Sequence, residues 1–252
     1  MRELTVTSRD AGQRLDKYLG KYLNKAPRSL IFRMLRKKNI KLNGKKAIGS
    51  ELLAETDHIQ LFFAEETIGS WMERVDWTAT HYPAILYEDD HILLLDKPCG
   101  LLTQKAKPQD ESLVDQLLYY LADKGQYDPE GSGCKPSVCN RLDRNTSGLV
   151  LAGKDQKGLQ LLSSLLRDRK LEKYYLCLVR GCFRKTLRLQ GYWKKDRKGN
   201  QALLSSQKTP GTDFVDTEFI PEIPGDSYSL VRARLITGKS HQIRSQIAKA
   251  GY

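Results

Sequence analysis

The stretch 139-CNRLDRNTSGLVLAGK-154 decides how most of this chain is interpreted. Its second half contains LVLA, a short apolar run of the kind that forms a buried strand, and the preceding Asn-Thr-Ser-Gly is typical of a turn. Its first half places Asp143 between Arg141 and Arg144, where the turn leads into that strand. The carboxylate could stabilise the turn through ion pairs, or it could carry out chemistry.

The charge of the chain predicts a polyanionic partner. The 252 residues include 42 Lys and Arg against 30 Asp and Glu, which gives a net charge of +12. Such a surplus attracts nucleic acid first and an anionic membrane surface second, although a basic surface can also lack a partner. We therefore expect RNA or DNA to bind.

The sequence contains no signal for export, for a membrane span or for a bound metal. The start, MRELTVTSRDAGQRLDKYL, lacks the apolar core of a signal peptide, and no apolar run approaches membrane-spanning length. The five cysteines do not have the spacing of zinc ligands, and no dinucleotide motif is present. We expect a cytoplasmic monomer with reduced thiols, no membrane contact, no metal and no cofactor.

Residues 1–66 are predicted to form a small unit of two helices and a β-hairpin. Apolar residues recur at helical spacing within 15–23 and again within 30–35, and KAPRS separates the two runs. Alternation then begins, and Asn43-Gly44 is a strong signal for a hairpin turn. The run HIQLFF is expected to add a last strand.

Basic side chains line the second helix and the hairpin: Arg28, Arg33, Arg36, Lys37, Lys38 and Lys45. Together with Arg14-Leu15-Asp16, Arg28-Ser29 and LNGKK, they resemble the small RNA-binding module first known from the S-four type of ribosomal protein. The resemblance implies that these six side chains dock on folded RNA through phosphate and shape contacts. A charged helix face without a ligand is the alternative.

The remainder of the chain is predicted to be a connector and one larger domain. Residues 67–82 mix Gly, Ser, acidic residues and two tryptophans without clear periodicity, which favours a connector. In residues 83–252, short β-type runs such as KYYLCLV and SLVRARLIT alternate with helical stretches such as SLVDQLLYYLADKG and SHQIRSQIAKAG, which predicts a mixed α and β domain. The fold class is therefore α+β, with a helix-helix-hairpin domain followed by a mixed-sheet domain.

Four stretches of the larger domain resemble the RluA-type pseudouridine synthases in their order and spacing: 86-LYEDDHILLLDKPCGLLTQ-104, 140-NRLDRNTSGLVL-151, 173-KYYLCLVRG-181 and 235-LITGKSHQIRSQI-247. The first and third alone could be ordinary β-elements. Arg-Leu-Asp-Arg-x-Thr-Ser-Gly and Gly-Lys-Ser-His-Gln-Ile-Arg together are highly specific. Many members also carry the RNA-binding module in front, so the resemblance covers essentially the whole chain. It implies an isomerase that converts uridine in RNA to pseudouridine.

That reaction explains the residue types of these motifs. The bond from ribose carbon-1′ to the base nitrogen breaks, the base rotates while it is held, and a bond to ring carbon-5 replaces it. One carboxylate, ionised near neutral pH, must act at the sugar or the ring. The resemblance implies Asp143 for this role and Arg244 as the cation that keeps it ionised. Tyr175 would stack on the target base, whereas Tyr174 would point to the opposite strand face.

The resemblance also assigns residues that bind the substrate. Arg141 would enter the RNA helix where the target base has been flipped out, which costs about a few kcal/mol. Arg144 is expected at a backbone phosphate. Lys97, Thr146 and Gln242 belong to the same motifs and are predicted to bind substrate as well.

The chain departs from the family pattern at three places. Asn140 stands where a His commonly precedes Arg-Leu-Asp, and Asp96 replaces a frequent Asn before Lys97. The sequence ends at Tyr252, where family members usually continue with a further strand and helix. The resemblance therefore implies that the end of the domain 83–252 is truncated.

Two other functions are alternatives to a pseudouridine synthase. Thr237-Gly238-Lys239-Ser240 suggests a phosphate-binding P-loop, but that motif needs a Gly five residues before Gly238, where this chain has Ala233. A catalytically inactive RNA-binding ribosome-assembly factor on the same fold stays open as an alternative. For an active enzyme, family analogy favours large-subunit (23S) ribosomal RNA over transfer RNA.

Overall fold

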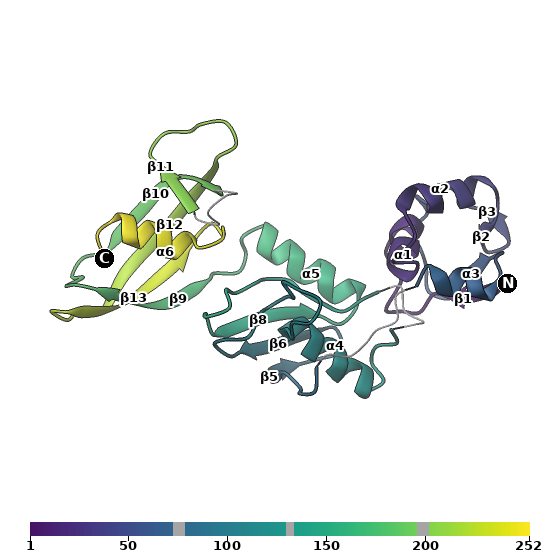
Figure 1. Ribbon diagram of the computed structural model, residues 1–252, viewed down its shortest axis with the longest axis horizontal. Coiled ribbons are helices and arrows are strands. Elements are labelled where there is room, and N and C mark those ends of the chain that lie inside the picture. The colour runs from purple at the N-terminus through teal and green to yellow at the C-terminus, as the bar shows by residue number, and fades with distance from the viewer. Residues whose placement is uncertain (73–78, 130–133, 196–201) are drawn as a thin grey trace. The chain divides into compact units, whose positions relative to one another are not determined.

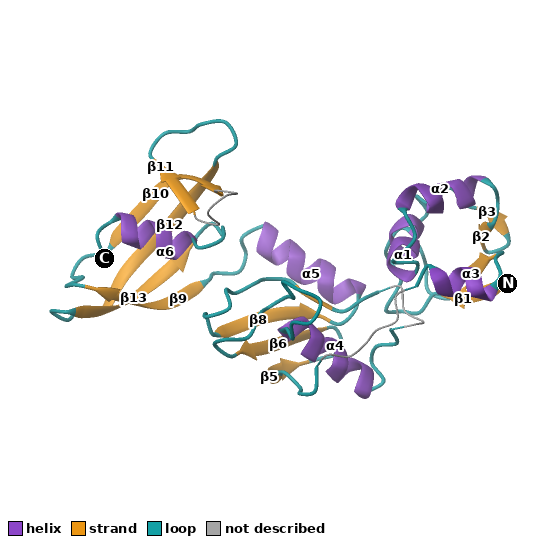
Figure 2. Cartoon of the chain, in the orientation of Figure 1, coloured by secondary structure: helices purple, strands orange, loops and turns teal. Residues whose placement is uncertain are grey.

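The computed structural model describes residues 1–72, 79–129, 134–195 and 202–252. These residues form two compact units, Met1–Ser164 and Leu165–Tyr252. Each unit contains helices and strands, which confirms the predicted α+β class (Figures 1 and 2). No helix in the described ranges combines the length and apolar character that crossing a membrane requires.

The N-terminal part of the first unit is a four-stranded sheet with two helices. Its strands are β1 (Arg2–Thr5), β2 (Ile40–Leu42), β3 (Lys45–Lys46) and β4 (His58–Leu61), in the order β1-β4-β2-β3. The helices are α1 (Leu15–Tyr22) and α2 (Arg28–Arg36). Leu19 of α1, Leu35 of α2 and Ile59 of β4 lie in one core. Both predicted helices and the last predicted strand are therefore present.

The predicted hairpin turn joins β2 to β3. Leu42 pairs with Lys45, so Asn43 and Gly44 form a two-residue loop, and both have left-handed backbone, with φ of 50° and 73°. This is the turn geometry that matches the twist of paired strands. The side-chain amide of Asn43 also binds the neighbouring strand β4, because its Oδ1 accepts from the backbone N–H of His58 at 2.8 Å.

Helix α3 (Glu65–Ser70) occupies the start of the predicted connector, residues 67–82. Ile68 is completely buried, and Trp71 packs on the same core as α1 and α2. The first residues of the connector thus pack on the N-terminal core. Residues 73–78 of the connector lie outside the described residues. The domain boundaries themselves stay predictions.

A second sheet in the first unit contains the apolar run of the stretch 139–154. Its strands are β5 (Ala84–Glu88), β6 (Ile92–Lys97), β7 (Ser137–Val138) and β8 (Gly148–Gly153), in the order β5-β6-β8-β7. The helices are α4 (Leu113–Asp123) and α5 (Gln156–Arg167), the latter ending in the second unit. Val150 and Ala152 of β8 pair with Leu95 and Leu93 of β6, and all four are completely buried. The predicted buried strand is confirmed.

The second unit is a five-stranded sheet with one helix. Its strands are β9 (Tyr174–Arg180), β10 (Leu187–Lys195), β11 (Ala202–Ser205), β12 (Asp213–Ile223) and β13 (Tyr228–Leu235), in the order β11-β10-β12-β13-β9. Helix α6 (Gln242–Lys249) contributes Ile247 to a core that includes Phe219, Val231 and Ala233. The sequence predicted β9, β13 and α6 but not β10, β11 or β12. The central strand of this sheet was therefore missed.

The sheets of both units are antiparallel. Every pairing between the named strands runs antiparallel, including β6 with β8, β12 with β13 and β13 with β9. The predicted mixed sheet is wrong in this respect, because the larger domain contributes one four-stranded and one five-stranded antiparallel sheet. Short connections such as that between β5 and β6 produce this arrangement, since a parallel neighbour requires a long crossover.

Gly158 near the start of α5 allows the helix to lie close to the turn before β6. A Cβ added at Gly158 would lie 2.0 Å from the carbonyl oxygen of His91. We expect Gly158→Ala to lower the free energy of unfolding by about 2–3 kcal/mol, because the backbone must move. Gly20→Ala in α1 is the matched control: nothing lies within 4 Å of its added Cβ, and it should stabilise by about 0.5–1 kcal/mol. Equal denaturation midpoints for the two variants would contradict this.

Candidate active site

The loop that carries Asp143 is fixed by a buried threonine. Leu142 is buried, and both of its backbone groups bond to Thr103: Thr103 Oγ1 donates to the carbonyl of Leu142 at 2.7 Å and accepts from its N–H at 3.2 Å. On the other side of the loop, the N–H of Thr146 donates to the carbonyl of Asp143 at 3.0 Å. Asp143 itself is half-buried. Its side chain therefore projects from a backbone that is held on both sides.

Lys97 ties this loop to the segment that follows β6. Its side chain is completely buried, and Nζ donates to the carbonyls of Pro98 and Leu101 at 2.8 Å each and of Arg144 at 3.1 Å. Burial lowers the pKa of Lys97, although the nearby charge of Asp143 opposes that shift. All three ammonium protons have backbone acceptors. Lys97 thus holds the loop with all three protons, and its predicted role in binding substrate stays a prediction.

Arg144 completes the link between the two segments. Its carbonyl accepts from the N–H of Gly100 at 2.9 Å, and its Nε donates to the carbonyl of Gly100 at 3.0 Å. Both Arg141 and Arg144 are exposed, and Thr146 is half-buried. The three predicted substrate contacts thus lie on the surface of the loop around Asp143.

Asn140 has a structural part at the base of the loop. Its Nδ2 donates to the carbonyl of Leu149 at 3.2 Å, and its Oδ1 accepts from the N–H of Leu151 at 2.7 Å. The side chain therefore extends the strand pairing of β8 where the loop begins. A carboxamide can provide both a donor and an acceptor at once, which explains how Asn serves where the family commonly has His.

In the second unit, Tyr175 lies on the sheet face that α6 covers. It pairs with Ala233 across β9 and β13, and it packs with Ile243 of α6 against the core of this unit. Tyr174 points to the other face, where its hydroxyl donates to Glu172 Oε2 at 2.8 Å. The strand alternation expected for these two tyrosines is thus observed. Tyr175 and the helix that carries Arg244 lie on the same side of the sheet.

Gln242 fixes the first turn of α6 and is almost completely buried. Its Nε2 donates to the carbonyl of Asp216 at 3.2 Å and to Thr217 Oγ1 at 2.9 Å. Its Oε1 accepts from Thr237 Oγ1 and from the N–H of Lys239, both at 3.1 Å. Every hydrogen-bonding position of the amide is used within the protein. Gln242 thus holds the β13–α6 loop, and its predicted role in binding substrate stays a prediction.

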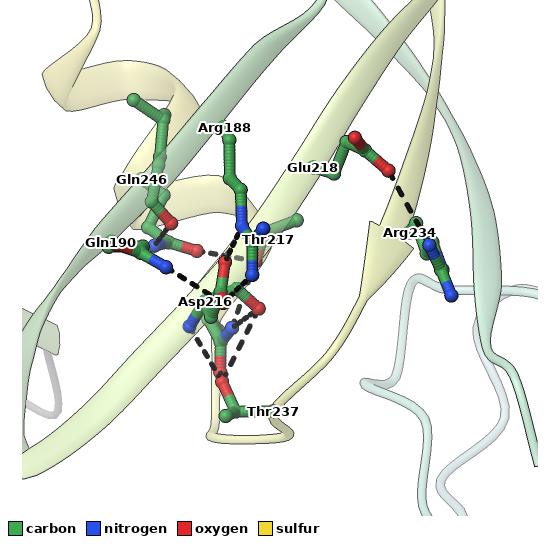
Figure 3. A network of polar contacts seen from close by, with 10 residues as sticks. Arg188, Gln190, Asp216, Thr217, Glu218, Arg234, Thr237 and Gln246 are labelled. Atoms are coloured by element: carbon green, nitrogen blue, oxygen red, sulfur yellow. Dashed lines mark hydrogen bonds and ion pairs between the residues drawn. The ribbon is translucent and has the colours of Figure 1, made fainter. Parts of the chain in front are cut away.

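Two further residues, which the sequence did not point to, connect α6 with the sheet (Figure 3). Gln246 accepts from Thr217 Oγ1 at 2.5 Å and donates to the carbonyl of Leu189 at 2.8 Å. The buried carboxylate of Asp216 accepts two bonds from Arg188, at 2.7 and 3.0 Å. Arg188 holds the pKa of Asp216 below its usual value. Arg244 is exposed on the helix that this network positions.

The predicted pairing of Asp143 with Arg244 stays a prediction. Asp143 belongs to the first unit, whereas Tyr175 and Arg244 belong to the second. Among the described residues, no group of three or more His, Cys, Asp and Glu side chains is placed to hold a metal ion.

The basic residues of the N-terminal part fall into two groups. Arg28 pairs with the buried carboxylate of Asp16 at 3.2 Å and lies over the ring of Phe32, so it stabilises the fold as well as adding charge. Burial raises the pKa of Asp16, but the bonds from Arg14 and Arg28 outweigh it and lower the pKa. The other predicted RNA contacts are exposed and form no ion pair with any described residue: Arg33, Arg36, Lys37, Lys38 and Lys45.

Comparison with known proteins assigns the chain. A family model described as RNA pseudouridylate synthase matches residues 91–249, the range that contains Asp143, Tyr175 and Arg244. The chain is also 31% identical to ribosomal large subunit pseudouridine synthase C of Escherichia coli K12, across 99% of this chain and 76% of that protein. The chain belongs to the RNA pseudouridylate synthase family. The resemblance inferred from the motifs, and the predicted class of isomerase acting on RNA uridines, are confirmed.

Other members of the pseudouridylate synthase family are similar over much of the chain. An uncharacterized RNA pseudouridine synthase of Mycoplasma genitalium is 29% identical, covering 95% of this chain and 76% of that protein. Two solved human structures share the fold: RNA pseudouridylate synthase domain containing 4, with a TM-score of 0.52, 18% identity and coverage of 66% and 64% of the two chains, and domain containing 1, with 0.53, 20%, 71% and 69%.

Proposed function

We propose that this pseudouridine synthase isomerises specific uridines of large-subunit ribosomal RNA, with Asp143 as its essential carboxylate. The observation that carries the proposal is the loop around Asp143, which lies inside the family-matched segment. Thr103 and Lys97 hold its backbone through buried hydrogen bonds, while Arg141 and Arg144 remain exposed beside the carboxylate. A carboxylate held at a fixed position next to cations suits both catalysis and binding of an anionic chain. The relatives named as large-subunit enzymes support this RNA as substrate.

The roles of the site residues follow from the reaction. Asp143 acts at ribose carbon-1′ or at the ring, and Arg244 keeps a carboxylate ionised in a pocket that excludes water. Tyr175 stacks on the base while the base is detached and turns, which prevents its loss. Arg141 fills the space that the flipped nucleotide leaves in the RNA, and Arg144 and Thr146 bind the adjoining backbone.

The N-terminal part is proposed to be an S-four-type RNA-binding domain of residues 1–66, with the catalytic domain at 83–252. Two helices and a hairpin share one core there. Five exposed cations without ion pairs to described residues project from α2 and the hairpin, including Arg33, Arg36 and Lys45. Unpaired exposed cations of this kind bind phosphates and make the affinity dependent on salt.

The test is a map of pseudouridines in cellular RNA with and without the protein. We expect the loss of one or a few pseudouridines in the large-subunit RNA, restored by the wild-type protein but not by Asp143→Asn. An unchanged map in all RNAs would contradict the enzyme. Loss confined to transfer RNA would retain the activity and contradict the ribosomal target.

A further inference from the structure

A cavity in the second unit carries an excess of positive charge that the reaction does not use. It has a volume of about 400 Å³ and lies where the end of α5, the start of β9, the start of β12 and the β13–α6 loop meet. Three cations line it, namely Arg169, Lys173 and Lys239, together with the single carboxylate of Asp213. The charge of the lining is therefore positive.

Two of these cations repel each other. Arg169 and Lys173 form no ion pair with any described acidic side chain. The pKa of Lys173 is lowered, first by burial and then by the charge of Arg169. The nearby carboxylate of Asp216 is bound bidentately by Arg188 instead. Two like charges in a partly enclosed space are stabilised when an anion enters.

The third cation, Lys239, has an ion pair and a ring contact of its own. Lys239 Nζ pairs with Asp213 Oδ2 at 2.7 Å and lies 5.9 Å from the ring centre of Trp193. Asp213 therefore pairs with Lys239 and not with Arg169 or Lys173, and the charge of Arg169 contributes to the lowered pKa of Asp216. These two are the side chains that an anion would meet.

The backbone of the β13–α6 loop lies close to one of them. A Cβ added at Gly238 would lie only 3.3 Å from Lys173 Nζ. Glycine thus leaves room beside the ammonium. Thr237, Gly238 and Lys239, which belong to a stretch that lacks the spacing of a P-loop, thus line a cationic cavity.

We propose that this cavity binds a phosphate of the RNA backbone next to the target nucleotide. The proposal rests on the proposed function. Two residues that line the cavity are close in sequence to the site residues of this unit. Lys173 precedes Tyr175 by two residues, and Lys239 precedes Arg244 by five. A volume of several hundred Å³ exceeds a single phosphate and suits a nucleotide. An RNA chain supplies a phosphate at every nucleotide.

The test removes the charges of Arg169 and Lys173 from the full chain. We expect Arg169→Gln combined with Lys173→Gln to weaken binding of a substrate RNA about tenfold, and to reduce the slope of log affinity against log salt by about 0.7–0.9. KM should rise while kcat changes little, since neither residue touches the reacting atoms. The control pair, Lys185→Gln with Lys208→Gln, removes two exposed charges of the same unit outside the cavity and should leave that slope closer to the wild-type value.

Lys173→Arg keeps the charge and should bind RNA nearly as well as the wild type, provided that thermal unfolding shows all variants folded. An unchanged salt slope in the Arg169/Lys173 double variant, with turnover intact, overturns the cavity proposal alone. Saturable binding of inorganic phosphate that the double variant loses, with RNA affinity unchanged, also overturns it by assigning the cavity to a free anion. Absence of turnover in the wild type contradicts the proposed function whatever the cavity binds.

Discussion

Asp143→Asn is expected to reduce pseudouridine formation by at least about 10⁴-fold while RNA affinity stays within about twofold. The substitution replaces a carboxylate with an amide of the same shape, so it removes the nucleophile or base without removing volume. The loop should keep its form, because its bonds to Thr103 and the contact of Thr146 with residue 143 involve backbone groups. Tritium release from a transcript labelled at uridine carbon-5 measures turnover, and a filter-binding titration measures affinity.

Asp96→Asn is the matched control for this experiment. Asp96 is exposed on β6, one residue before Lys97, so the substitution makes the same change of charge on the strand that pairs with β8, the strand that follows the Asp143 loop. We expect its turnover to stay within about threefold of the wild type, because surface substitutions rarely have larger effects. Full turnover in Asp143→Asn would contradict the essential carboxylate. A wild-type protein that binds ribosomal RNA but converts no uridine would instead support the inactive assembly factor.

Much of the fold could be predicted because the signals are local. The hairpin depends on Asn43-Gly44, and both of these residues have the left-handed backbone that such a turn requires. Strand β8 depends on an apolar run bounded by turn residues, and α4 on leucines at helical spacing, of which Leu113, Leu117 and Leu121 are buried. Each of these elements is determined by fewer than a dozen neighbouring residues.

The elements that were missed lack such a signal or have a weak one. Helix α3 is only six residues long, too short for helical spacing to become visible. Strand β12 does alternate, with Val215, Thr217 and Phe219 buried, and this period of two could have revealed it. Its polar positions include Asp216, whose partners Arg188 and Gln190 come from another strand. That network depends on pairing far along the chain.

The roles of the site residues are limited in another way in how far the sequence predicts them. The motifs brought Lys97 and Gln242 to attention, but their contacts are largely to backbone carbonyls and N–H groups. Every residue has these backbone groups, so the sequence carries no sign of which side chain they bind. The motifs therefore point to this lysine and this glutamine without showing that their polar atoms have partners within the fold.

Lys97→Met is expected to impair both stability and turnover, because Lys97 joins the loop of Asp143 to residues 98–101. Methionine has a similar volume, but it leaves the carbonyls of Pro98 and Leu101 without their buried donor and the carbonyl of Arg144 with only the N–H of Gly100. We expect the free energy of unfolding to fall by about 3 kcal/mol. At a temperature where the variant is folded, kcat should fall about 100-fold, since a displacement of about 1 Å has that effect.

Lys154→Met separates the loss of stability from the loss of loop position. Lys154 is also buried, and its Nζ donates to Glu88 Oε1 at 2.7 Å and to the carbonyl of Asp89 at 2.8 Å. It follows β8 at the end of the strand where Gly153 pairs with Ile92, whereas Lys97 pairs with Gly148 at the other end. Lys154→Met should therefore destabilise comparably but retain kcat when folded. If the two variants lose turnover only in proportion to their unfolded fractions, Lys97 does not position the carboxylate.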